Sequence, residues 1–77
     1  MSEHHHSIPD TPEKASALLT HLCEHNESHE EELKALGQQL ARLGFAEEAS
    51  CVNEACALYA RGNEKLRSAS TSVRSKL

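Results

Sequence analysis

The sequence predicts an all-α fold: an antiparallel two-helix hairpin that dimerises into a four-helix bundle. Three observations support this prediction. Helix-forming residues dominate from residue 12 to residue 43, a glycine-containing break follows, and a second helical stretch comes after it. No alternating strand pattern occurs, and a length of 77 residues limits the chain to one domain.

The first helix is predicted to begin within the segment DTPEK, at residues 10 to 14. Asp10 or Thr11 can cap its first turn, and Pro12 suits the first helical position. The polar, histidine-rich residues 1–10 are expected to be disordered.

The segment LGF, at residues 43 to 45, is predicted to separate the helices, with Gly44 as the left-handed residue after the first one. The second helix is expected to run from Ala46 to about Ser70. Residues 11–72 would then form the hairpin domain, and the Ser-rich end at residues 73–77 is expected to fray.

A hairpin of this composition has few large side chains with which to build a core. The chain has one Phe, one Tyr and no Trp, and a monomer of this length buries only about 60% of its unfolded surface. We therefore expect a homodimer, in which the exposed faces of two hairpins cover each other.

The charge and the hydropathy exclude several kinds of partner. A formal net charge of −4 argues against nucleic acid and anionic membranes. No apolar run approaches the roughly 18 residues of a transmembrane helix. The first residues lack the apolar core of a secretion signal, so the expected compartment is the cytoplasm and the three cysteines are expected to be thiols.

The segment HLCEHNESHEEELKAL, at residues 21 to 36, places three histidines at four-residue intervals on the first helix. On a helical wheel His25 and His29 fall within the leucine stripe of that helix, His21 lies at its edge, and Glu32 lies beside them. Cys23 points away from this stripe. The stripe is thus expected to carry a buried polar layer, whose imidazoles need partners.

The second helix has a seam of its own with alternating spacings of four and three. In an antiparallel hairpin around Gly44, opposing residue numbers add up to roughly 89. This register predicts that His29 lies near Tyr59 and His25 near Asn63. Tyr59 and Asn63 are then expected to form hydrogen bonds with the imidazoles. The seam comprises Phe45, Ala49, Val52, Cys56, Tyr59, Asn63, Leu66 and Val73.

Histidines four residues apart on one helical face can chelate a metal ion. We expect His25 and His29 to be the first ligands, followed by His21. Glu32, Cys56 or a histidine of a second chain would complete the shell. Imidazole suits zinc, copper and nickel, so the donors do not choose the metal. The alternative is a metal-free polar layer that sets the pairing of the helices.

The N-terminus carries a separate metal-binding pattern. After removal of Met1, the chain would begin Ser2-Glu3-His4, with a free amine and a histidine at the third position. Such a sequence can hold Cu(II) or Ni(II) in a square plane of nitrogen atoms. His5 and His6 add further donors. The alternative interpretation of these three histidines is a remnant of a purification tag.

Residues 21 to 29, HLCEHNESH, resemble the signature His-Trp-x-x-His-Asn-x-x-His of a family of small, uncharacterised helical domains. His21, His25, Asn26 and His29 match it, and Leu22 stands where the signature has Trp. The similarity extends over residues 15 to 67. It implies that the four matching residues act as a unit, and it implies no particular metal.

The sequence therefore predicts a transition-metal-binding protein for nickel, copper or zinc, with a role in storage, delivery or sensing. Expected partners are a second copy and a protein that receives the metal. The alternative function is a metal-free dimerisation and interaction module. No nucleophile with an oriented base and no paired Glu-x-x-His pattern is present, so we do not expect an enzyme.

Overall fold

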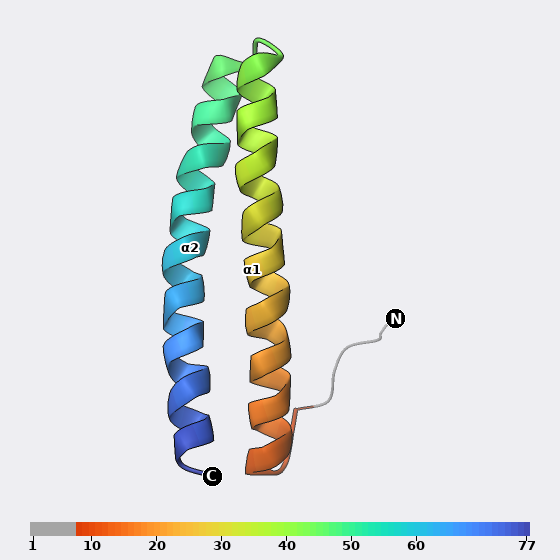
Figure 1. Cartoon of the computed structure of the whole chain (residues 1–77), viewed down its shortest axis with the longest axis vertical. Helices are drawn as coiled ribbons and strands as arrows, with labels where there is room; N and C mark the ends of the chain where they lie inside the picture. Colours follow the sequence, from red (N-terminus) through yellow and green to blue (C-terminus); the bar gives the residue numbers. More distant parts are fainter. Residues whose placement is uncertain (1–7) are drawn as a thin grey trace.

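The protein is a hairpin of two long helices that lie side by side (Figure 1). The computed structural model describes residues 8–77. Helix α1 runs over Pro12–Arg42 and helix α2 over Ala46–Ser75. The predicted all-α hairpin is confirmed, and no strand occurs within the described residues. Residues 1–7, for which the sequence predicts disorder and a metal-binding pattern, lie outside the described part of the chain.

Helix α1 begins where the sequence predicts. Thr11 has extended backbone angles, and its Oγ1 accepts a hydrogen bond from the backbone N–H of Lys14 at 3.2 Å. Pro12 opens the helix, where its missing N–H removes no helical hydrogen bond. Glu13 adds a negative charge at the positive end of the helix dipole.

The turn between the helices is a complete Schellman motif. The N–H of Phe45 donates to the carbonyl of Leu40 at 2.9 Å, and the N–H of Gly44 donates to the carbonyl of Ala41 at 3.2 Å. Gly44 has a φ of 94°, a conformation that residues with a Cβ rarely adopt. The predicted left-handed glycine is therefore confirmed.

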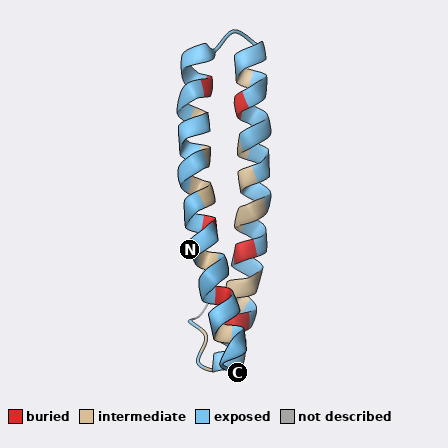
Figure 2. Cartoon of the chain, turned by 60° about the vertical axis from the view of Figure 1, so that its left-hand side comes forward, coloured by how far each residue is buried: buried red, intermediate tan, exposed pale blue. Residues whose placement is uncertain are grey.

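The buried residues of the two helices are small or polar, and no leucine of the described residues is among them. On each helix the contact residues recur every seventh position, and most of them are buried (Figure 2). Two, Glu30 and Cys56, are half-buried. These contact residues are Ser16, Cys23, Glu30 and Gly37 on α1, and Ala49, Cys56, Asn63 and Ser70 on α2.

Cys23, which the sequence places off the leucine stripe and to which it assigns no role, is buried between the helices. Small side chains let the backbones of two helices approach closely. At Gly37 an added Cβ would displace the end of the Asn53 side chain, which lies over this glycine. The leucines of α1 are half-buried or exposed.

Hydrogen bonds between the helices fix their register. Asn63 Nδ2 donates to the carbonyl of Asn26 at 3.2 Å and to Glu30 Oε1 at 2.8 Å. Near the open end the hydroxyls of Thr20 and Ser70 lie 3.3 Å apart. Because the residue numbers 26 and 63 add up to 89, the predicted register is confirmed.

The hairpin has two different faces. Large apolar side chains gather on one of them, which we call the apolar face. On the opposite side Arg67 is paired with Glu27, and Arg74 donates to Thr20. The pKa of Arg67 is raised, mainly by the hydrogen bond to Glu27 and to a smaller extent by the negative charge of Glu27. The apolar face comprises Leu22, Leu33, Leu36, Leu40, Tyr59 and Leu66, all half-buried or exposed.

Helix α2 continues beyond its predicted end near Ser70. It reaches Ser75, where the hydroxyl donates to the carbonyl of Ser72 at 2.8 Å. Contacts with α1 explain the extra length, since Arg74 reaches Thr20 and Val73 is half-buried. Neither helix, within the described residues, is long and apolar enough to cross a membrane.

Candidate metal centre

His25 and His29 bring two imidazole nitrogens together on the surface of α1. They lie one helical turn apart, and their Nε2 atoms are 2.9 Å from each other. The rings meet edge to face, with centroids 4.4 Å apart. Both side chains are exposed, and that of His29 retains 46% of its accessible surface. The prediction of a buried imidazole layer is therefore wrong for this chain on its own.

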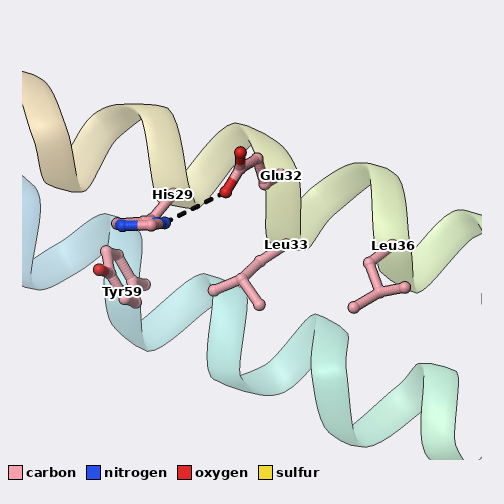
Figure 3. Close-up of a pocket in the computed structure, with 5 residues that line it drawn as sticks. All are labelled: His29, Glu32, Leu33, Leu36 and Tyr59. Carbon is pink, nitrogen blue, oxygen red and sulfur yellow. Dashed lines mark hydrogen bonds and ion pairs between the residues drawn. The ribbon is translucent and has the colours of Figure 1, made fainter.

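Glu32 holds the His29 ring from its other side. Its Oε1 lies 3.1 Å from His29 Nδ1 (Figure 3). A carboxylate in this position favours the tautomer with the proton on Nδ1, which leaves the Nε2 lone pair free. In the hydrogen-bonded pair His25 Nε2–H then donates to His29 Nε2. Glu32 thus orients the His29 ring, whereas the sequence predicted Glu32 as a further metal ligand.

The two nitrogens are spaced for chelation. For an ion bonded to both nitrogens at about 2.0–2.1 Å, the N–metal–N angle would be roughly 90°. Opening their separation to about 3.3 Å, which small rotations of the side chains allow, gives the tetrahedral angle that zinc prefers. An ion bound here would take the place of the proton that the imidazoles now share.

His21 extends the row by one turn. Its ring stacks on that of His25, with centroids 6.1 Å apart and an angle of 22° between the planes. Stacked rings present their faces to each other, so their nitrogens do not converge as those of His25 and His29 do. His21 is therefore next to the candidate ligand pair without joining it.

The remaining predicted site residues are not brought to the pair. Cys56 Sγ donates to the carbonyl of Glu30 at 3.6 Å, inside the helix contact. Within residues 8–77, no three or more His, Cys, Asp or Glu side chains are placed to share an ion. His4, His5 and His6 lie outside the described residues. The chain as described thus supplies two nitrogen donors.

Tyr59 and Asn63 do not hydrogen-bond to the histidines, which corrects a prediction. Both bond to Asn26 instead, Tyr59 through its hydroxyl to Asn26 Oδ1 at 3.5 Å. Asn63 thus lies beside Asn26, the chain neighbour of His25, at the level that the register predicts, but it donates no hydrogen bond to His25. The expected proximity of His29 and Tyr59 is confirmed, because both line one open depression of about 410 Å³ with Glu32, Leu33 and Leu36 (Figure 3).

The sequence did not predict that Cys23 and Glu30 lie between the helices. Glu30 accepts a hydrogen bond from Asn63 and its carbonyl faces Cys56. A signal for both was present, since Ser16, Cys23, Glu30 and Gly37 recur every seventh residue on one side of α1. Three of these four side chains are small, which is the pattern of closely packed helices.

A family model described as a domain of unknown function (DUF8180) matches residues 15–73. This match agrees with the expected similarity to a small uncharacterised domain family. The His-Trp-x-x-His-Asn-x-x-His signature is not established by it and stays a prediction. No curated protein and no solved structure matches the chain.

Proposed function

The chain belongs to this family of unknown function, and from its side-chain geometry we propose that it binds a transition metal ion through His25 and His29. The observation that supports this proposal is the convergence of two Nε2 atoms, 2.9 Å apart, one of them on a ring held by a carboxylate. Nickel, copper and zinc all suit imidazole ligands. Storage, delivery or sensing of the ion in the cytoplasm fits such a site better than catalysis.

The N-terminal histidines would form a second, independent site. Ser2-Glu3-His4 with a free amine suits Cu(II) or Ni(II) in a square plane, and His5 and His6 add donors. Its task would be capture of the ion and transfer to the helix pair or to a protein that receives it. Because this segment precedes α1, its loss should leave the helix site intact.

Titration calorimetry with Zn(II), Ni(II) and Cu(II) on a tagless protein tests the helix site. We expect a His25→Ala, His29→Ala double variant to lose it, and a variant without residues 2–6 to keep it. Glu32→Gln should weaken binding roughly 10- to 100-fold, because the supporting carboxylate is lost. Glu31→Gln removes an equal charge from the exposed neighbouring residue and should bind as the parent does.

If Glu31→Gln weakened binding as much as Glu32→Gln, general electrostatic attraction would replace the positioned carboxylate as the cause. If the double histidine variant bound metal like the parent, the helix site would be disproved. Affinity should also fall as the solution is acidified, since protons compete with the metal ion for the imidazole nitrogens.

The second candidate function is a metal-free interaction module that dimerises into a four-helix bundle. The observation favouring it is that Asn26, Glu30 and Asn63 satisfy one another between the helices, and His25 and His29 already share a hydrogen bond. A dimer and a melting temperature that are unchanged by metal or chelator would support this function over the first.

A further inference from the structure

The hairpin is a single layer of two helices with an uncovered apolar face. The shortest principal dimension of its Cα positions is 13 Å. Stable domains need two packed layers around a core, yet only two apolar side chains among residues 8–77 are buried, Cys23 and Ala49. On the apolar face Leu36 keeps 49% of its surface exposed. A second layer is needed to cover this face.

The size of the face suits a second copy of the chain. Helix α1 is 31 residues long, so the face is about 46 Å long and about 20 Å wide, or roughly 900 Å². A standard protein interface buries about 800 Å² on each partner. A two-fold axis would place the face on itself, and every leucine of the apolar face would then meet an apolar surface.

The histidine pair stands at the middle of this face. Helix α1 spans residues 12 to 42, so its midpoint is residue 27, between His25 and His29. His29 also lines the depression formed with Leu33, Leu36 and Tyr59. Full overlap of two faces across a two-fold axis at the midpoint therefore brings both histidine pairs to one level.

Resting on the proposed metal binding, we propose that two copies share one metal ion at this axis. The α1 helices pack antiparallel with residue numbers that add up to 54, so His25 of one copy faces His29 of the other and Leu18 faces Leu36. Each copy contributes two Nε2 atoms, which together complete a four-coordinate nitrogen shell. Each Glu32 stays behind its own His29 as the supporting carboxylate. The ion thereby becomes a determinant of assembly.

Sedimentation equilibrium with Zn(II) titration on the full chain tests this proposal. We expect one tight zinc ion per two chains and a dimer that tightens at least tenfold when zinc is added. His25→Ala and His29→Ala should each abolish the zinc effect on assembly. A parallel titration of a variant without residues 2–6 separates any zinc held by the N-terminal histidines from the stoichiometry.

Two matched glutamate substitutions test the face. Leu36→Glu places a charge in the proposed interface and should give a monomer that binds zinc at least tenfold more weakly, although both histidines remain. Leu58→Glu makes the same change at a residue that is 69% exposed and does not line the depression. It should dimerise and bind zinc like the parent. Circular dichroism checks that both variants keep their helices.

The outcomes separate the two proposals. One zinc ion per monomer, with no dimer, overturns the shared site while leaving the proposed metal binding in place. A dimer that Leu58→Glu disrupts and Leu36→Glu does not overturns the choice of face. If the parent binds neither zinc, nickel nor copper, the proposed function is overturned, and the shared site with it.

Discussion

Asn63 is the side chain that ties the two helices together at mid-length. It is buried, and its amide donates both to a backbone carbonyl and to the carboxylate of Glu30. A buried carboxylate without a donor is costly, so this amide compensates for the half-buried position of Glu30. The same pairing explains why a glutamate is tolerated among small contact residues.

We expect Asn63→Ala to lower the free energy of unfolding by about 1–3 kcal/mol, because it leaves Glu30 without its donor. Asn63→Asp should be worse at neutral pH, since two carboxylates would then face each other. That repulsion raises the pKa of the pair in the folded variant, so its stability should recover as the pH falls. Urea unfolding at several pH values measures both effects.

The exposed residue Gln38 provides the matched control. Gln38→Glu makes the same change of an amide to a carboxylate without facing Glu30 and should shift stability by less than about 0.5 kcal/mol. Equal destabilisation by the two acidic substitutions, with no recovery at low pH for either, would contradict the role given to Asn63.

The way in which α1 packs on α2 depends on the absence of side-chain bulk at the contact positions. Ala49 is almost completely buried, and the end of the Asn53 side chain lies over Gly37. Bulkier residues would push the helices apart and break the hydrogen bonds from Asn63. The close approach therefore determines which other side chains remain outside the contact, the leucines and histidines among them.

Gly37→Leu should lower the free energy of unfolding by about 1–3 kcal/mol or more, because the new side chain overfills the contact. Leucine has the higher helix propensity, so any loss must come from packing between the helices. Thermal unfolding followed by circular dichroism measures the change. Gln38→Leu adds the same side chain at the exposed next position and should be neutral or slightly stabilising.

The turn contributes to the hairpin in a different way. Its Schellman hydrogen bonds use the backbone of Leu40, Ala41, Gly44 and Phe45, so they set the reversal of the chain independently of what the helices bury. At the far end, by contrast, side chains such as Thr20, Ser70 and Arg74 hold the helices together. The hairpin is thus closed by backbone geometry at one end and by side-chain contacts at the other.

As one unit, the chain has long helices but almost no core of its own. No large side chain of the described residues is fully buried, and Leu43 and Phe45 are exposed beside the turn. Folding of such a chain is expected to be linked to self-association, because covering the apolar face supplies the burial that the single layer lacks.

The melting temperature should therefore rise with protein concentration, and it should rise further at each concentration when zinc is added. In the Leu36→Glu variant both dependences should disappear. Scanning calorimetry over a hundredfold range of concentration measures this. A melting temperature that stays constant over that range would show that the single hairpin is stable without a partner.

Short-range chemistry accounts for what could be predicted without the structure. The cap at Thr11, the break at Gly44 and the absence of strands each depend on residues close together in the chain. The register followed from them, because a tight turn determines which residues of two antiparallel helices face each other. His29 and Tyr59 were accordingly expected at the same level, where they are found.

Residues that are close together in the chain do not predict which side of α1 faces α2. A leucine stripe and a column of small residues are both present on α1, and the stripe is the pattern that predicts the contact. In the structure α1 faces α2 with its column of small residues, so Cys23 is buried and His25 and His29 are exposed. Which side faces α2 depends on two competing sources of stability. One is close backbone packing with the hydrogen bonds from Asn63, and the other is burial of the leucines. Their balance depends on all contacts along both helices at once, which no local pattern contains.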